Sequence, residues 1–420
     1  MQNILLHLHP SKVSERSLTF NRTFGLGGMA ALLIVIQIIT GILLRFYYIP
    51  SPAGAYSSVV FLKRQVLFGQ FVRNIHYWSG VFLLMTAFLH FLRVFLTGAF
   101  REDRRINWLF GLSLLAVIVL SNFTGYLLPW DQLAYWAITV STNIIGYFPF
   151  FGESLRMTII GGKELNADTL QSFFTVHSAL LPFMLLLIVV YHFWRVRKSG
   201  GIMLPAGQDK GEMLPVMPSL VYREFILALL LIAVLFLFAA VFNAPLLERA
   251  NPVYSMNPTK APWYFAGVQE LLMHFHPFFA AFIIPLGVLA FLAWIPFISY
   301  DQKPSGHWFI SEKGKRSAKA TAVFAAGVTL AGIFFNAWVL NFEMIMPGIP
   351  AVISNGIIPL AILSLLMAVY YRLYLKRFRL SKAEKVQAAF VFIVVSFVIL
   401  TLCGIFFRGK DMALMLPWNV

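Results

Sequence analysis

The sequence predicts an all-α polytopic membrane protein, with a four-helix bundle in its N-terminal part and four to five further transmembrane helices. Hydrophobic residues make up 59% of the 420 residues, charged residues only 12%, and the mean hydropathy is +0.77. A bilayer requires about 20 consecutive apolar residues per helix, and nine runs of that kind follow one another along the chain. This composition excludes a soluble globular protein.

The nine candidate spans divide into two groups. A polar linker at residues 197–219 separates the first four from the other five, so we expect one domain at 1–205 and a second at 206–420. The spans lie near 26–48, 74–97, 108–129, 173–195, 222–243, 277–299, 320–341, 354–374 and 385–407.

The distribution of basic residues predicts the orientation of the chain. If the spans alternate in direction, the side that holds the N-terminal arm collects 23 of the 33 Lys and Arg residues. Cytoplasmic loops carry such an excess, so we expect a cytoplasmic N-terminus and a bacterial inner membrane. The same rule accounts for the net charge of +16 without a nucleic-acid partner.

Four of the nine histidines lie inside predicted spans, where ionisable side chains are rare unless they are functional. His76 and His90 are fourteen residues apart in the second span, and His177 and His192 are fifteen apart in the fourth. Four helical turns take about 14.4 residues, so both histidines of a span face nearly the same way. Both spans run in the same direction, which predicts two stacked bis-histidine sites at two depths.

Haem iron is the metal centre that this arrangement fits best, because two facing helices supply axial ligands on opposite sides of a flat ring. The only cysteine, Cys403, lies in an apolar run, so the sequence has no thiolate cluster and no C-x-x-C-H attachment site. Zinc would lack ligands at each level. Core histidines bonded to polar neighbours, and a transporter that relays protons, are the other interpretations.

Two glycine pairs repeat the fourteen-residue spacing. Gly27 and Gly41 lie in the first span, and Gly111 and Gly125 in the third. Glycine lets a bulky planar ring approach a helix backbone closely, so we expect these positions to contact the haems. Ordinary helix packing is the alternative.

Two arginines lie at the edges of the predicted haem levels. Arg73 comes three residues before His76, and Arg93 three residues after His90. A guanidinium group is suited to binding haem propionates. Snorkelling of these side chains to the membrane interface is the alternative.

The histidines, the glycine pairs and the stretch GYLLPWDQLAYWAITVSTN (125–143) carry a family resemblance. The chain resembles cytochrome b of the quinol–cytochrome c/plastocyanin reductases, closely over the first four spans and more loosely beyond. The fifteen-residue histidine spacing, followed by FWRVRKSGGI, resembles the chloroplast and cyanobacterial branch. The resemblance implies that His76 pairs with His177 and His90 with His192. It implies two non-covalent b-type haems, and the position of Cys403 implies no covalent haem.

The resemblance also implies a quinol oxidation pocket on the external side, near Tyr126, Trp136 and Tyr264. The sequence APWY at 261–264 resembles the Pro-Glu-Trp-Tyr loop of the family. The family's glutamate, a proposed proton acceptor, is replaced here by Pro262, which cannot accept a proton.

Three residues after this motif are candidates to replace that glutamate. Glu270 is the first candidate for the proton acceptor, and His274 and His276 are the next. Their alternative roles are helix capping and surface solvation.

The function that the resemblance implies is that of a di-haem redox subunit. It would oxidise quinol outside, pass electrons through two b haems to a cytoplasmic-side quinone, and translocate protons. The implied partners are a Rieske iron–sulfur protein, c-type cytochromes, membrane lipid and a second copy of the complex. Arg195 and Arg197 lie at the depth of the cytoplasmic-side quinone, where snorkelling explains them equally well. The alternative is a non-bifurcating di-haem conduit between menaquinol and external multihaem c-type cytochromes, which the missing glutamate favours.

Overall fold

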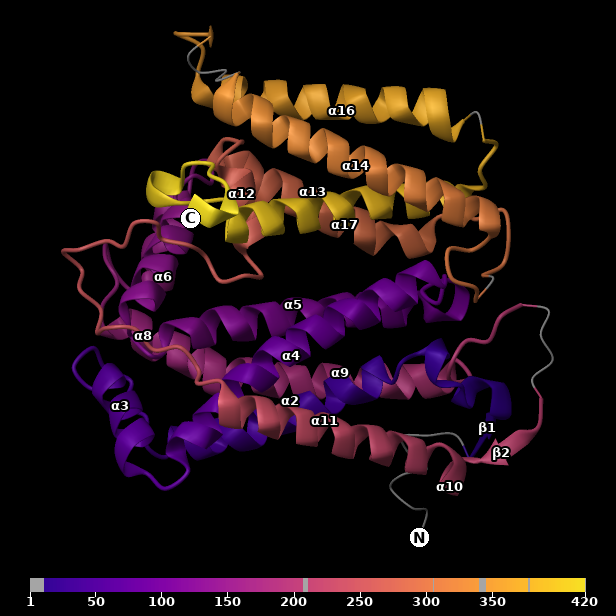
Figure 1. Ribbon diagram of the computed structural model, residues 1–420, viewed down its shortest axis with the longest axis horizontal. Coiled ribbons are helices and arrows are strands. Elements are labelled where there is room, and N and C mark those ends of the chain that lie inside the picture. The colour runs from indigo at the N-terminus through magenta and orange to yellow at the C-terminus, as the bar shows by residue number, and fades with distance from the viewer. Residues whose placement is uncertain (1–10, 207–210, 305, 340–344, 377, 420) are drawn as a thin grey trace. The chain divides into compact units, whose positions relative to one another are not determined.

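The computed structural model describes residues 11–206, 211–304, 306–339, 345–376 and 378–419 (Figure 1). The chain divides into two compact units. The first comprises Met1–Ala134, Leu165–Ala250 and Pro304–Trp308, and the second comprises Tyr135–Glu164, Asn251–Lys303 and Phe309–Val420.

Nine helices in these described ranges are long and apolar enough to cross a membrane, which confirms the predicted all-α polytopic membrane fold. Each overlaps one predicted span, and the last two residues of the predicted span 320–341 lie outside the described residues. The helices are Leu26–Arg45, Gly69–Leu96, Glu102–Leu127, Ala167–Lys198, Val216–Val241, Phe279–Phe297, Glu312–Trp338, Ile353–Leu375 and Lys382–Phe406.

The first unit is a bundle in which α2 packs on α4, α5 packs on α9, and α11 packs on α4. Strands β1 and β2 pair antiparallel and join the N-terminal arm to the segment before α11. Helix α6 (Gln132–Ile145) begins in this unit and continues into the second. The elements are β1 (Lys12–Ser14), η1 (Glu15–Leu18), η2 (Phe20–Arg22), α2 (Leu26–Arg45), α3 (Ala55–Gln65), α4 (Gly69–Leu96), η3 (Glu102–Arg104), α5 (Arg105–Leu127), α8 (Ala167–Thr175), η4 (Val176–Leu180), α9 (Leu181–Lys198), β2 (Met213–Pro215), α10 (Val216–Ser219) and α11 (Val221–Val241).

Side-chain bonds to main-chain groups attach α11 to α4. The buried Asn74 donates from Nδ2 to the carbonyl oxygen of Ala239, and Trp78 donates from Nε1 to the carbonyl oxygen of Phe242. The first compact unit therefore extends beyond the boundary predicted near residue 205 and includes the fifth span.

Three π-helical turns each precede a proline. Proline lacks an N–H group and its ring clashes with the carbonyl four residues earlier, and a widened π turn relieves both problems. The three cases are η4 before Pro182, η5 (Phe279–Ile283) before Pro285, and η7 (Ile353–Ile357) before Pro359.

In the second unit, α17 packs along α14 and α12. A capping box between Ser381 and Glu384 begins α17, and the chain after α17 turns back beside α12 (Figure 1). Besides η5 and η7, the elements are α7 (Gly152–Ile160), α12 (Ala266–Leu272), α13 (Ile284–Trp294), η6 (Ile295–Phe297), α14 (Glu312–Trp338), α16 (Ile358–Tyr370), η8 (Tyr371–Leu375), α17 (Lys382–Phe406), η9 (Lys410–Met412) and η10 (Pro417–Asn419).

Candidate functional site

The four predicted histidine ligands lie in the first unit. His76 and His90 belong to α4, His177 to the π turn η4, and His192 to α9. The imidazole centroids of His76 and His177 are 6.2 Å apart, and their planes stand at 81°. Metal–imidazole bonds of about 2.0 Å on both sides would put two ring centroids roughly 6.3 Å apart. This pair therefore has the separation that one iron atom with two axial imidazoles requires.

Hydrogen bonds fix which ring nitrogen of this pair carries the proton. The Nδ1 of His177 lies 2.9 Å from the carbonyl oxygen of Ser121 in α5, and since a carbonyl only accepts, Nδ1 is the donor. The Nδ1 of His76 lies 2.9 Å from the hydroxyl oxygen of Thr40 in α2, which donates its own proton to the carbonyl of Ile36. Both imidazoles therefore keep the Nε2 lone pair, as a metal-ligating histidine does.

The second pair, His90 and His192, has other surroundings. The two imidazoles lie close enough for a charge on His192 to act on His90. In the part of the chain that the structure describes, neither buried Nδ1 has a hydrogen-bond partner of normal geometry, although the backbone of Asn107 lies beside His192. Buried polar atoms without a partner are rare in native structures. Haem ligation by His90 and His192 stays a prediction.

Each predicted glycine lies against one of the four histidines. The fit is closest at Gly125, where a side-chain Cβ would lie 2.5 Å from Cε1 of His177. At the other three glycines the corresponding distance is 3.2 to 3.6 Å. The missing side chains make room for the imidazoles themselves, and contact with a haem edge stays a prediction. The pairs are Gly27 with His90, Gly41 with His76, Gly111 with His192, and Gly125 with His177.

The π turn η4 accounts for the fifteen-residue spacing of the second histidine pair in the sequence. The N–H of Leu181 bonds to the carbonyl of Val176, five residues earlier. Because a π turn inserts one extra residue into a helix, fifteen residues from His177 to His192 advance about as far as fourteen residues of regular α-helix.

Both predicted propionate-binding arginines are buried and donate to backbone carbonyl groups. Arg73 donates from Nη1 to Ala244 over 2.8 Å and from Nη2 to Pro245 over 2.6 Å, which attaches α4 to the segment after α11. Arg93 donates from Nε to the carbonyl of Arg22 over 2.9 Å. Propionate binding by either arginine stays a prediction. At Arg73, a propionate would have to share the Nη1 and Nη2 donors with the carbonyl oxygens of Ala244 and Pro245.

Arg93 also borders a small cavity of about 90 Å³ in the first unit. Two guanidinium groups and one imidazole give this cavity a lining that is suited to a carboxylate group. Its lining residues are Asn21, Arg22, Arg93, Thr97, Met203, Gly306, His307 and Trp308.

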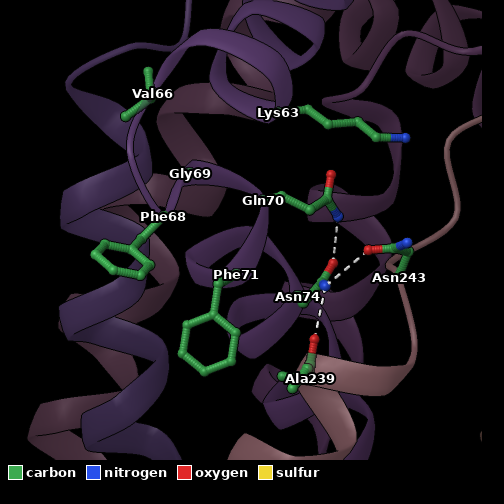
Figure 2. Close-up of a pocket in the computed structure, with 10 residues that line it drawn as sticks. Lys63, Val66, Phe68, Gly69, Gln70, Phe71, Asn74, Ala239 and Asn243 are labelled. Carbon is green, nitrogen blue, oxygen red and sulfur yellow. Dashed lines mark hydrogen bonds between the residues drawn. The ribbon is translucent and has the colours of Figure 1, made fainter.

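A larger cavity, of about 280 Å³, lies where the start of α4 meets the end of α11 (Figure 2). Asn74 in its lining accepts from Gln70 Nε2 and from the N–H of Ala244, and it donates to Ala239 and to Asn243 Oδ1. All four hydrogen-bonding positions of this amide are thus used. Asn74 fixes α4 against α11 two residues before the first ligand histidine, a role that the sequence analysis missed.

The residues predicted to line the quinol pocket fall in both units. Tyr126 belongs to α5 in the first unit, and Trp136, Tyr264 and Glu270 belong to the second. Trp136 in α6 donates from Nε1 to the carbonyl of Tyr254 over 2.8 Å. This bond ties α6 to the segment that leads to the Ala-Pro-Trp-Tyr motif, and the roles of these residues in quinol binding stay predictions.

The motif itself is braced by one amide side chain of α12. Gln269 Oε1 accepts from the N–H of Ala261 over 2.7 Å, and its Nε2 donates to the carbonyl of Thr259 over 2.8 Å. The N–H of Phe265 bonds to the carbonyl of Pro262 over 2.8 Å. The bend around the motif is therefore hydrogen-bonded before and after Pro262.

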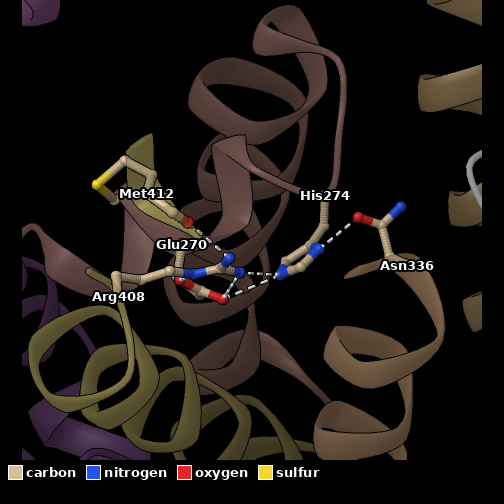
Figure 3. Close-up of polar contacts among 5 residues, drawn as sticks. All are labelled: Glu270, His274, Asn336, Arg408 and Met412. Carbon is tan, nitrogen blue, oxygen red and sulfur yellow. Dashed lines mark hydrogen bonds and ion pairs between the residues drawn. The ribbon is translucent and has the colours of Figure 1, made fainter. Parts of the chain in front are cut away.

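Glu270 is the centre of a buried polar cluster (Figure 3). Arg408 contacts both of its carboxylate oxygens, from Nε over 2.8 Å and from Nη2 over 2.6 Å. The third guanidinium nitrogen, Nη1, donates to the carbonyl of Met412. His274 lies 3.0 Å from the carboxylate through Nε2, and its Nδ1 lies 2.7 Å from Asn336 Oδ1.

Arg408 is the functional candidate that the sequence analysis missed. It lies 138 residues from Glu270, in the tail after the last span. The only signal in the sequence is that this tail places an arginine directly after an apolar helix.

The partners of Glu270 decide its charge. Burial acts to raise the pKa of this carboxyl, but hydrogen bonds from His274 and Arg408, together with the Arg408 charge, hold the pKa below its ordinary value of 4.5. Glu270 is therefore ionised at neutral pH and neutralises Arg408. Its predicted role as proton acceptor remains a prediction, and in that role it would be a weakened base.

His276, the third candidate, lies outside this cluster. Its ring meets that of Tyr147 edge to face at 5.7 Å between centroids, and burial lowers the pKa of its imidazole. Its Nδ1 accepts from the N–H of Phe278 over 3.3 Å, which leaves Nε2 as the donor of the neutral ring.

The Glu270–Arg408 ion pair generates a stability prediction. Replacing Glu270 by Gln leaves a buried guanidinium without its counter-ion, and we expect a loss of about 3–5 kcal/mol in the free energy of unfolding. The double variant Glu270→Leu/Arg408→Met is expected to recover most of this loss, because it buries no unpaired charge. Detergent-exchange unfolding followed by tryptophan fluorescence measures both values.

The pH dependence of this stability has a definite sign. Because the pKa of folded Glu270 is lowered, the pair stabilises the fold above pH 4.5, the ordinary value, and the contribution disappears as the pH falls through the lowered pKa. The double variant should lack this acid-sensitive component, and an identical acid sensitivity in both proteins would contradict the prediction.

The chain is similar to known proteins of one family. The Cytochrome b/b6/petB family model matches residues 12–200. Cytochrome b6 of Heliomicrobium gestii is 39% identical over 182 residues, which cover 43% of this chain and 85% of that protein. Cytochrome b6 of Synechococcus elongatus is 37% identical over 180 residues, which cover 43% of this chain and 84% of that protein.

A solved structure, described as hyperthermophilic respiratory Complex III, matches with a TM-score of 0.66 over 94% of this chain and 93% of that chain. At 24% sequence identity this match shows the fold alone. The family model covers the spans that carry the four histidines, and these relatives are 37% and 39% identical over 84% and 85% of their own length. The chain belongs to the cytochrome b/b6 family.

Proposed function

We propose that the chain is the di-haem cytochrome b subunit of a membrane quinol:cytochrome c oxidoreductase. The observation that carries this proposal is the His76–His177 pair. Its imidazole centroids are 6.2 Å apart, and both Nδ1 atoms donate hydrogen bonds to protein oxygen atoms. Both Nε2 lone pairs thus remain for one iron. Membership of the family implies b-type haem, and the His90–His192 pair would hold a second one.

Each b-type haem, when bound, would supply reversible one-electron transfer, and His76, His177, His90 and His192 would hold the two haems. The chain's own residues set the geometry. Fourteen residues of α4 between His76 and His90 advance roughly 21 Å, so the two pairs would lie at two depths of the membrane. Thr40 and Ser121 orient the imidazoles of the first pair and strengthen their Nε2 donors.

In this proposal quinol is oxidised at the external face, near Tyr126, Trp136 and Tyr264. One electron leaves to a Rieske iron–sulfur protein and then to a c-type cytochrome, and the other crosses the membrane toward a quinone on the cytoplasmic side. Protons are released outside and taken up inside. Glu270 is the first candidate for the proton acceptor, and the geometry of its cluster makes His274 the nearest alternative.

The cellular setting belongs to the same proposal. The excess of Lys and Arg on one side supports a cytoplasmic N-terminus in a bacterial inner membrane. The complex would be a homodimer surrounded by lipid. The basic cavity beside Arg93 would receive a haem propionate at the level of His90.

The first test is a count of haems in the purified protein and in one ligand variant. A reduced-minus-oxidised spectrum should show two b haems per chain, and acid–acetone should extract both. His90→Ala should lose the haem of the His90–His192 pair alone, because the other pair keeps both ligands. The control His276→Ala should keep two haems, and loss of none in His90→Ala would refute the pairing.

A glycine variant tests the close approach of helix and imidazole. Gly125→Ala places a Cβ 2.5 Å from His177, so the ring must move and the haem of the His76–His177 pair should be lost or shifted in its spectrum. Gly28→Ala is the matched control, because nothing lies within 4 Å of its Cβ position. Equal spectra of the two variants would contradict this role of Gly125.

The proton-acceptor role of Glu270 has its own test. If Glu270 accepts a proton from quinol, Glu270→Gln slows quinol oxidation per haem and removes a limb of the pH profile. Glu153→Gln, which alters an exposed ion pair with Arg156, is the control. An unchanged rate and pH profile in the Glu270 variant would remove this residue from the role.

The second candidate function is a non-bifurcating di-haem conduit between menaquinol and external multihaem c-type cytochromes. The observation that favours it is Pro262 in place of the loop glutamate, together with the neutralised charge of Glu270. Inhibitors of the external pocket distinguish the two functions. Extra b-haem reduction in the presence of inhibitor supports the bifurcated reaction, and its absence supports the conduit.

A further inference from the structure

The chain after α17 forms a small closed turn, residues 407–415, called here the tail turn. The N–H of Met415 bonds to the carbonyl of Phe407 over 2.8 Å, and the N–H of Gly409 bonds to the carbonyl of Ala413 over 3.0 Å. These two bonds hold the backbone of the tail turn in one conformation. The tail turn therefore presents its side chains to the rest of the second unit in fixed positions.

The tail turn is bonded directly to residues 257–264, called here the motif segment, which ends in Pro-Trp-Tyr. Asn257 Nδ2 donates to Asp411 Oδ1 over 2.5 Å, and the N–H of Asp411 donates back to Asn257 Oδ1 over 2.7 Å. Lys260 Nζ donates to the carbonyl of Ile405, at the end of α17, over 3.0 Å. Two positions of the motif segment thus depend on the C-terminal part of the chain.

Close packing of α12 on α17 fixes the distance between the two segments. A Cβ on Gly404 would lie 2.7 Å from the carbonyl oxygen of Ala266, and a Cβ on Gly267 would lie 2.6 Å from Thr401 Oγ1. The backbone of α17 therefore meets that of α12 at Gly404, and Gly267 of α12 meets side chains of α17. This brings the buried Glu270 of α12 within reach of Arg408, the second residue of the tail turn.

Arg408 joins α12 to the tail turn. Two of its nitrogens bind the carboxylate of Glu270, and the third binds the carbonyl of Met412 inside the tail turn. A planar guanidinium group that donates in three fixed directions holds both partners in one geometry. A lysine ammonium would supply the charge without the fork.

We propose that Arg408 is a positioning residue for quinol oxidation, because it fastens the tail turn to α12 and so sets the geometry of the motif segment. The inference rests on the proposed function, since quinol is the substrate that the motif segment would contact. It assigns a role to the tail that follows the last span. The fastening acts through Glu270 on one side and through the Asn257–Asp411 bonds on the other.

The experiment measures steady-state oxidation of a soluble menaquinol analogue by the purified complex, expressed per b haem. Arg408→Gln should lower kcat/KM by at least about tenfold, mainly through KM, because small displacements of binding groups are costly. Arg408→Lys should recover part of the loss. Lys410→Gln removes a positive charge from the same turn at an exposed side chain, and it should match the unaltered protein.

A milder set of variants covers the case in which Arg408→Gln does not fold. Asn257→Ala, Asp411→Ala and the double variant form a cycle across the bonds between the two segments. A positioning role predicts a raised KM in each single variant and little further change in the double variant, with the haem spectrum intact.

The outcomes separate the two proposals. If the unaltered complex contains two haems but oxidises no quinol, the proposed function fails and this inference falls with it. If the unaltered complex is active and KM stays the same in all the variants, only the role of Arg408 is overturned. Loss of activity in strict proportion to loss of haem would show a purely structural ion pair, and would also overturn it.

Discussion

The first unit depends on the close approach of two buried imidazoles, those of His76 and His177, whose centroids lie 6.2 Å apart. An apolar bilayer offers no water to satisfy a ring nitrogen, so the Nδ1 atoms of this pair need protein partners. Ser121 and Thr40 supply the partners, from helices that precede the ligands in the bundle. The glycine opposite each ring lets the helices come close enough for this arrangement. Helix packing and ligand chemistry are therefore parts of one constraint.

The same constraint explains an irregularity in the fourth span. A proline at position 182 would clash with a regular helix, and the π turn η4 absorbs it by inserting one residue. The inserted residue lies next to His177, so the spacing to His192 becomes fifteen without a change in depth. The irregular helical turn and the position of His177 thus have the same cause.

In the second unit, a buried ion pair between Glu270 and Arg408 is the corresponding constraint. A buried carboxylate is stable only when its desolvation is offset by hydrogen bonds and an opposite charge. Glu270 obtains both from Arg408 and His274, and the link reaches into the tail that follows the last span. The Ala-Pro-Trp-Tyr motif lacks the family's glutamate, yet a carboxylate lies one helix further along in a fully paired state. The structural match covers 94% of this chain, whereas the sequence match to cytochrome b6 of Heliomicrobium gestii covers 43% of it.

The sequence by itself determined the nine spans, the two histidine pairs and the fourteen-residue glycine spacing. These features follow from the period of a helix and from the width of a bilayer, both of which act along the chain. It left open what each glycine meets, which nitrogen of the His76 and His177 imidazoles carries a proton, and why one histidine spacing is longer by one residue. Only the tertiary structure decided these points, together with the partner of Glu270. Arg408 is 138 residues away from that carboxylate, and a contact over such a distance arises from helix packing, which no local pattern encodes.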